Sequence, residues 1–380
     1  VSRLTRLPEP QVRAALRLLE EGATIPFIAR YRKEATGSLD EVQLREVDAA
    51  RGRISDLEAR RATIRAAIEA QGSLTPELAQ KIDAASSKTV LEDLYLPYKK
   101  RRKTRADQAR ERGLEPLARR LLEQPAKGDP MDEARAFVGP EVPDAEAALA
   151  GASDIAAEAV AERAEVRARL RWLYASKGEL TAKLARGVDR EESKFSDWDG
   201  FSQLARSVPS HRYLALDRGE REKALRVKIE VDAREAQAIL REGAGFRRES
   251  PFGRLLDAAL EDAFSRLLAP SLERELRAEL EARAHEAAVK VFAENLKELL
   301  LAAPFGAKAV LGVDPGLRTG SKCALVASSG ELLAHETVFL TRSGAEKDKA
   351  KVALRKLVTE GAPEAIAVGN GTGGRETEAF

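Results

Sequence analysis

The sequence predicts a multidomain chain in which an all-α N-terminal region, residues 1–305, precedes an incomplete α/β domain, residues 306–380. Residues 1–305 are rich in Ala, Leu, Glu and Arg, which are strong helix formers. From Ala309 the pattern changes to short apolar runs separated by glycine-containing turns, which is typical of β-strands. A chain of 380 residues is long enough to form two or more domains with a sizeable buried core.

The composition excludes several classes of protein. Hydrophobic residues make up 43% and charged residues 33%, which argues against a disordered chain. No run approaches the roughly 18 apolar residues of a membrane span. The single cysteine, Cys323, rules out an internal disulfide and suggests a cytoplasmic protein, and with only three histidines it argues against structural zinc. The net charge of +2 means that any basic surface must be local.

Capping signals divide the helical region. Ser38 and Glu41 form a capping-box pattern before a long helix over residues 39–70, and Thr89 and Glu92 repeat it. Thr75-Pro76 opens another helix because proline is tolerated in the first turn. Residues 124–143 read as a loop-rich connection, and residues 251–301 return to helix.

One segment of the helical region has strand character. Leu225, Val227, Ile229 and Val231 alternate with polar residues, which predicts a half-buried strand. Because Tyr213–Leu216 is followed by the turn-like Asp217–Glu220, we predict a small β-hairpin near residues 213–232.

The C-terminal residues predict strands over 309–314, 321–328 and 331–340, a helix over 345–360 and a fourth strand over 364–368. This β-β-β-α-β order, with a right-handed crossover to a parallel strand, is the first half of a ribonuclease H-like fold. A glycine-rich loop, residues 369–374, then enters a second helix. Further strands and helices are needed to cover such a sheet, so we expect the natural protein to be longer.

Five strings of this sequence closely resemble the bacterial transcription accessory protein family called Tex. They are ATIPFIARYRKEATGSLDE, LEDLYLPYKKRRKTRADQARERGLEPLA, PSHRYLALDRGE, LLLAAPFGAKAVLGVDPGLRTG and AVGNGTGGRETE. The resemblance implies helix-turn-helix character in the N-terminal region and a ribonuclease H-like domain of the YqgF type. It also implies helix-hairpin-helix and S1 modules in the natural protein, neither of which we find in this sequence. A eukaryotic transcription elongation factor shares this architecture, so the resemblance implies a connection with RNA polymerase.

One acidic position raises the question of catalysis. Nucleases of this fold hold two divalent metal ions on several carboxylates at strand ends. Asp314 ends the first predicted strand, and Glu376, ahead of Glu378, is the best candidate for a second ligand. Two carboxylates make a weak metal site, so we favour a structural role in which Asp314 caps the following turn, and we predict no cofactor. The alternatives are a vestigial acidic site of Asp314 and Glu376 that contacts nucleic acid, and an active nuclease that uses Mg²⁺ or Mn²⁺.

Two basic segments are candidates for nucleic-acid contact. The run Lys99–Arg105 holds six cations and follows Tyr95 and Tyr98, whose rings could stack on bases. Its alternative interpretation is a solvated segment paired with Glu92, Asp93 and Glu111. The second segment is Arg30–Lys33, for which we favour a structural role with Phe27, Ile28 and Tyr31 in the core. The candidate contacts are Lys99, Lys100, Arg101, Arg102, Lys103, Arg105, Arg30 and Arg32.

The glycine-rich loop 369–374 lacks the Lys-Ser/Thr pair of a P-loop, which argues against nucleotide hydrolysis. The loop either contacts a phosphate through its backbone or packs beside Asp314. Together these patterns predict a cytoplasmic, non-enzymatic transcription accessory factor that binds RNA or DNA. The alternatives are a metal-dependent nuclease and a protein-binding helical scaffold.

Overall fold

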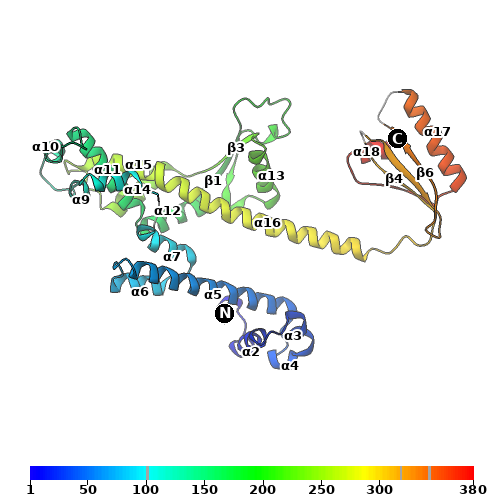
Figure 1. The fold of residues 1–380 in the computed structure, drawn as a ribbon, viewed down its shortest axis with the longest axis horizontal. Helices are drawn as coiled ribbons and strands as arrows, with labels where there is room; N and C mark the ends of the chain where they lie inside the picture. The colour runs from blue at the N-terminus through cyan, green and yellow to red at the C-terminus, as the bar shows by residue number, and fades with distance from the viewer. Residues whose placement is uncertain (100–101, 317–318, 341–343) are drawn as a thin grey trace. The chain divides into compact units, whose positions relative to one another are not determined.

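The computed structural model describes residues 1–99, 102–316, 319–340 and 344–380. Over these residues the chain is mostly helical, carries two small sheets and divides into two compact units, Val1–Lys290 and Val291–Phe380 (Figure 1). In the part of the chain that is described, no helix is long and apolar enough to cross a membrane.

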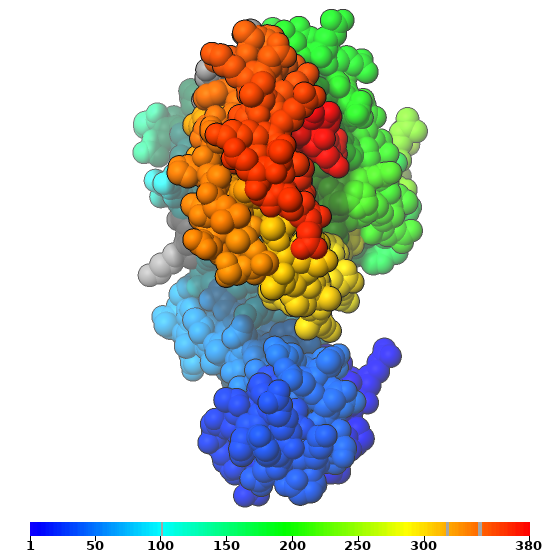
Figure 2. Space-filling view, turned by 90° about the vertical axis from the view of Figure 1, so that its right-hand side faces the viewer, coloured from blue at the N-terminus to red at the C-terminus, as the bar shows by residue number. Residues whose placement is uncertain are grey.

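The first unit begins with a bundle of short helices around the start of one long helix. Its helices are α1 (Ser2–Thr5), α2 (Glu9–Glu20), α3 (Ile25–Tyr31), α4 (Lys33–Thr36) and α5 (Glu41–Glu69). Val12, Ile28 and Leu44 belong to its core. The N-terminal residues of the chain, dark blue in Figure 2, form a rounded lobe. Gly37 ends α4 with φ 61°, and its carbonyl accepts a hydrogen bond from Gln11 Nε2 at 3.1 Å, which ties α4 to α2.

The long helix α5 is capped by Asp40, so the predicted capping box at Ser38 and Glu41 is wrong by two residues. The Asp40 carboxylate accepts from the Gln43 amide at 2.8 Å, and the Gln43 side chain accepts from the Asp40 amide at 3.0 Å. Ser38 instead follows Gly37 with φ 66° and lies outside the helix.

Two helices pack against the second half of α5. They are α6 (Pro76–Ala84), which the predicted Thr75 caps, and α7 (Lys88–Tyr95). The predicted cap at Thr89 is wrong because the Ser87 hydroxyl accepts from the Val90 amide at 3.3 Å. Ile64, Ile82 and Leu91 are fully buried where these helices meet.

The rest of the first unit is also mainly helical. Its helices are α8 (Arg105–Glu111), α9 (Glu115–Glu123), α10 (Pro130–Arg135), α11 (Ala145–Ala161), α12 (Ala164–Lys177), α13 (Ser210–Arg221), α14 (Ala233–Ala244), α15 (Gly253–Asp262) and α16 (Ala269–Leu301), which continues past the unit boundary at Lys290, with a π-helical turn over Ala263–Leu268. The predicted loop over 124–143 therefore contains a short helix, α10. Small residues let α11 approach its neighbours, since a Cβ at Gly151 would lie 2.4 Å from Leu114 Cδ1.

A three-stranded antiparallel sheet interrupts these helices. Its order is β2 (Phe201–Leu204), β1 (Glu179–Leu184), β3 (Leu225–Glu230). The predicted strand is confirmed at β3, where Leu225, Val227 and Ile229 are buried. The predicted hairpin is wrong, because Tyr213 to Leu216 belong to α13. Tyr213, Leu216 and Gly219 are buried three residues apart, which suits a helix face and not a strand.

A buried carboxylate connects α7 to α12. Asp93 is 5% exposed and accepts from Arg167 Nε at 2.7 Å and from Arg171 Nη2 at 2.8 Å. Arg171 also binds Glu275 of α16. Burial acts to lower the pKa of the Arg171 guanidinium, but Glu275 and Asp93 outweigh it, so the pKa is raised.

The second unit contains a four-stranded sheet in the order β6 (Leu332–Val338), β5 (Ser321–Val326), β4 (Val310–Asp314), β7 (Ala365–Val368). β4 is antiparallel to β5 and parallel to β7, and α17 (Gly344–Gly361) connects β6 to β7. Ala350 and Leu357 of α17 pack on Leu311, Cys323 and other residues of the sheet. The predicted β-β-β-α-β order is confirmed, with element ends displaced by a few residues.

We predict that Arg167→Ala lowers the free energy of unfolding of the first unit by about 3–5 kcal/mol, because it leaves the buried Asp93 carboxylate without one of its two cations. Urea denaturation followed by tryptophan fluorescence measures this, since both tryptophans, Trp172 and Trp198, lie in the first unit. Arg13→Ala is the control, because Arg13 and Glu9 form an exposed pair whose loss costs about 0–1 kcal/mol. Equal effects of the two substitutions would contradict the importance of this network.

Candidate nucleic-acid interface and the Asp314 strand end

Asp314 lies at the end of β4, exposed to solvent and close to the loop that follows β7. The Gly369 amide donates to the Val313 carbonyl at 2.8 Å. A Cβ at position 369 would lie 3.0 Å from Pro315 Cδ and 3.6 Å from Asp314 Oδ1. The prediction that this loop packs beside Asp314 is therefore confirmed at Gly369, where a side chain would press on Pro315 and touch Asp314.

The other candidate carboxylates lie in α18 (Gly374–Ala379). Glu376 and Glu378 are both exposed. Within the described ranges, no three His, Cys, Asp or Glu side chains gather as a metal site. The role in which Asp314 caps the following turn stays a prediction, because residues 317 and 318 of that turn lie outside the described residues.

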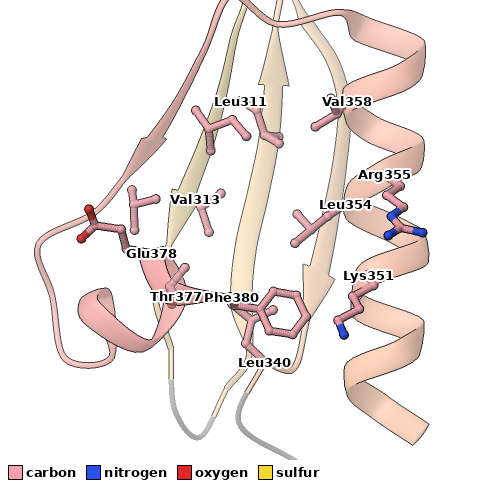
Figure 3. A pocket seen from close by; sticks show the side chains of 12 residues that line it. Leu311, Val313, Leu340, Lys351, Leu354, Arg355, Val358, Thr377, Glu378 and Phe380 are labelled. Atoms are coloured by element: carbon pink, nitrogen blue, oxygen red, sulfur yellow. The ribbon is translucent and has the colours of Figure 1, made fainter. Parts of the chain in front are cut away.

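A hollow of about 460 Å³ opens on the sheet face beside α17 and α18 (Figure 3). Leu311, Val313, Leu340 and further apolar side chains line it, and Lys351 and Arg355 extend from α17 at its border. The Lys351 ammonium lies 5.8 Å from the centre of the Phe380 ring. This hollow suits an apolar group, and its lining brings no pair of carboxylates together for acid–base chemistry.

The basic run forms the connection between a 3₁₀ turn, Leu96–Tyr98, and α8. Its described members, Lys99, Arg102, Lys103 and Arg105, are all exposed. The predicted contacts Lys100 and Arg101 lie outside the described residues. The end of the run is fixed by Thr104, whose hydroxyl accepts from the Asp107 amide at 3.0 Å while Asp107 Oδ2 accepts from the Thr104 amide at 2.9 Å.

The acids proposed as partners of the run are mostly engaged elsewhere. Glu92 accepts from Arg60 Nε at 2.6 Å, and Asp93 is held by two arginines of α12. Lys103 pairs with Glu111, as the alternative interpretation expects. Arg105 interacts electrostatically with Asp154. The pKa of Asp154 is raised because burial outweighs the lowering effect of Arg266 and Arg105. Among the described residues, Lys99 and Arg102 have no ion pair.

Tyr95 and Tyr98 are not free rings. Both are half-buried and pack on the core of Ile64, Ile68 and Leu91. The Arg60 guanidinium lies 5.7 Å from the centre of the Tyr95 ring. These rings therefore support the start of the basic run, and their use as a base-stacking surface is not favoured.

The second basic segment carries exposed aromatic rings that were predicted to lie in the core. Ile28 is fully buried, but Phe27 is 45% and Tyr31 is 68% exposed, so their assignment to the core is wrong. Arg30 and Arg32, the predicted contacts, are exposed beside them. The signal that could have separated these residues is the spacing: Phe27 and Tyr31 are four residues apart, on a helix face that Ile28 does not share.

The fold and surface define a multidomain, mostly helical protein with a small α/β unit and a locally basic helical region. Three family models match it: the Tex-like protein N-terminal domain over residues 1–69, the Tex central region-like model over 125–292 and the Tex protein YqgF-like domain over 308–380. The chain therefore belongs to the Tex family along these three stretches.

Curated relatives match almost the whole chain. Protein tex of Bordetella pertussis is 43% identical over 97% of this chain and 48% of its own length. Transcriptional accessory protein Tex of Neisseria gonorrhoeae is 41% identical over 97% of this chain and 49% of its own length. The human S1 RNA-binding domain-containing protein 1 is 30% identical over 98% of this chain and 38% of its own length. The chain thus spans about half the length of its bacterial relatives and less of the human protein.

We predict that Cys323 of the folded protein resists thiol reagents at pH 8. Burial, with a smaller contribution from Glu336, raises the pKa of this thiol to about 11. About one thiol in a thousand is therefore ionised at pH 8, against about a quarter at an ordinary pKa near 8.5. An aromatic disulfide reagent should label the chain slowly when folded, faster as the pH rises toward 11, and stoichiometrically in guanidinium chloride. Rapid labelling at pH 8 without denaturant would show that β5 opens readily.

Proposed function

We propose that this chain is a nucleic-acid-binding accessory factor of transcription. The names of its relatives support the proposal: one is called a transcriptional accessory protein, and another carries an S1 RNA-binding domain in its name. The observation that carries it is the exposed basic run, where Lys99 and Arg102 lack an ion pair among the described residues while Glu92 and Asp93 are bound by other arginines. Cations without local acids attract a polyanion, and Lys and Arg side chains of this kind neutralise the phosphates of nucleic acids.

We also propose a fold class for the second unit, a partner and a location for this chain. The observed strand order and the parallel β4–β7 pair support a ribonuclease H-like classification of the YqgF-like unit. We further propose helix-turn-helix character in the N-terminal bundle, an association with RNA polymerase and a cytoplasmic location. We also propose that the chain has no catalytic role and no cofactor, since the carboxylates described near β4 are too few for a two-metal site.

A metal-dependent nuclease is the second candidate function. The exposed Asp314 at the end of β4, beside the loop leaving the parallel strand β7, is the observation in its favour. In that function Asp314 and Glu376 would hold Mg²⁺ or Mn²⁺. A protein-binding helical scaffold differs from both by showing no salt-dependent affinity for nucleic acid.

We predict that replacing Lys99, Arg102 and Lys103 together by alanine weakens nucleic-acid binding for all sequences alike. If all three cations contact phosphates, the slope of log affinity against log salt should fall by about 2 units for single strands and by nearly 3 for duplexes. Titrations of labelled RNA and DNA oligonucleotides at several salt concentrations measure the slope.

The matched control removes three exposed cations from other helices, Arg135, Arg169 and Lys177, each of which is paired with an acid. It changes the net charge equally and should leave the slope within a fraction of a unit. Thermal melts check that both proteins fold. A slope that is unchanged in the run variant, or equally reduced in both variants, would mean that the run is not the phosphate contact.

We expect no Mg²⁺- or Mn²⁺-dependent cleavage of RNA, duplex DNA or branched DNA by the purified chain. The physical reason is that two exposed carboxylates without a third do not hold two hard cations firmly. Gel assays with end-labelled substrates test this. Turnover that disappears in Asp314→Asn would establish the nuclease in place of the non-catalytic factor.

A further inference from the structure

Helix α3 presents two aromatic rings to solvent. Phe27 and Tyr31 are 45% and 68% exposed, and their ring centroids lie 5.5 Å apart. They are four residues apart and so share one face of the helix, while Ile28 enters the core from another face. Two exposed rings in contact form a small apolar patch beside charged residues, which is the kind of surface that marks an interaction site.

The unpaired charges around the two rings are positive. Among the described residues, Arg30 and Lys33 have no ion pair, and Arg30 lies three residues from Phe27 on the same side of the helix. The acids of this segment already have partners: Glu34 pairs with Arg32, Asp40 accepts from the Gln43 amide, and Glu41 pairs with Arg45. A ligand of this face therefore needs negative charge as well as flat apolar surface.

We propose that Phe27 and Tyr31 are a stacking platform for bases of a single-stranded nucleic acid, with Arg30 and Lys33 binding its phosphates. The inference rests on the proposed function and adds to it a second contact of a different chemical kind. Bases stack on aromatic rings in a sequence-tolerant way, and nearby cations follow the backbone.

The ring geometry favours a single strand over a duplex. The planes of Phe27 and Tyr31 are inclined by 44°, so one rigid stack of paired bases does not lie flat on both. A single strand can turn each unpaired base separately toward one ring. The bases of a duplex are covered by their neighbours and have no free faces to offer.

The platform is held in place by the turn that follows it. The Thr36 hydroxyl is fully buried and donates to the Arg32 carbonyl at 3.3 Å. The Gly37 carbonyl binds Gln11 of α2, and a Cβ at Gly37 would lie 2.5 Å from Gln11 Nε2. Because α3 and α4 are fixed to α2 in this way, a strand that binds does not have to order the helix first.

The test separates base stacking from phosphate contact. Fluorescence anisotropy would compare a labelled single-stranded oligonucleotide, a strand of equal length with abasic sites in place of its bases, and a duplex. For the base-bearing strand, replacing Phe27 and Tyr31 together by alanine should lower affinity by about 5- to 150-fold for each base that loses its stacking partner. The abasic strand and the duplex should bind the variant as they bind the wild type, and the salt slope should not change.

Three further variants keep the result interpretable. Tyr31→Phe retains the ring and should bind normally. Arg30→Ala with Lys33→Ala should lower the salt slope for single strands by about 1.4 units while the base dependence remains. Leu4→Ala with Val42→Ala, two other exposed apolar residues of the bundle, is the matched control and should have no effect.

The outcomes distinguish the inference from the proposed function. If the ring variant binds the base-bearing strand normally while the basic-run variant still lowers the slope, the platform is wrong and the nucleic-acid-binding function stands. That result would leave the rings as a surface for a protein partner. An equal loss for abasic and base-bearing strands would also overturn stacking. If the wild type shows no salt-dependent binding to any strand, the proposed function fails, and the platform fails with it.

Discussion

The arrangement of the first unit depends most on the ion pairs that the buried Asp93 carboxylate forms. Two arginines of α12 bind it, and one of them extends to Glu275 of α16, so a single charge connects α7 to two other helices. An ion pair at this depth gives little net stability but is costly to break, because the remaining charge has no water to solvate it. It therefore fixes how α7 lies against the central helices more than it adds to stability.

This network also shapes the surface next to it. The basic run begins four residues after α7 ends at Tyr95. Asp93 is close to the run in sequence but does not pair with it, because two arginines of α12 already bind the carboxylate. Glu92 is likewise held by Arg60. The same logic applies at α3, where the acids of the segment bind other partners and Arg30 is left beside two exposed rings. In a chain of net charge +2, positive surface arises from this local pairing of acids and not from an excess of cations.

Sequence patterns predicted the elements whose signal is local. The alternation at Leu225–Glu230 and the apolar runs behind the β-β-β-α-β order of the second unit each extend over several residues, and both predictions are confirmed.

Elements that depend on distant residues were missed. The partner of β3 is β1, which lies about forty residues earlier, and short-range turn signals do not report such pairing. The cap of α5 was missed because Ser38 and Asp40 are both good caps, and the left-handed Gly37–Ser38 turn decides between them. The exposure of Phe27 and Tyr31 depends on which neighbours the bundle supplies, and a composition rule that buries aromatic residues cannot foresee it.

The end of β4 has the opposite electrostatic character from the two basic segments. Asp314 is exposed, and Gly369 lets the backbone of the next loop come close to its carboxylate. A carboxylate repels phosphate unless a hard cation lies between them, whereas backbone amides and arginines attract phosphate directly. A chain that binds nucleic acid without a metal would therefore contact phosphates through its N-terminal basic segments and not through Asp314. A chain that cleaves it would need the cation first, so the charge at Asp314 separates the two functions more sharply than the fold does.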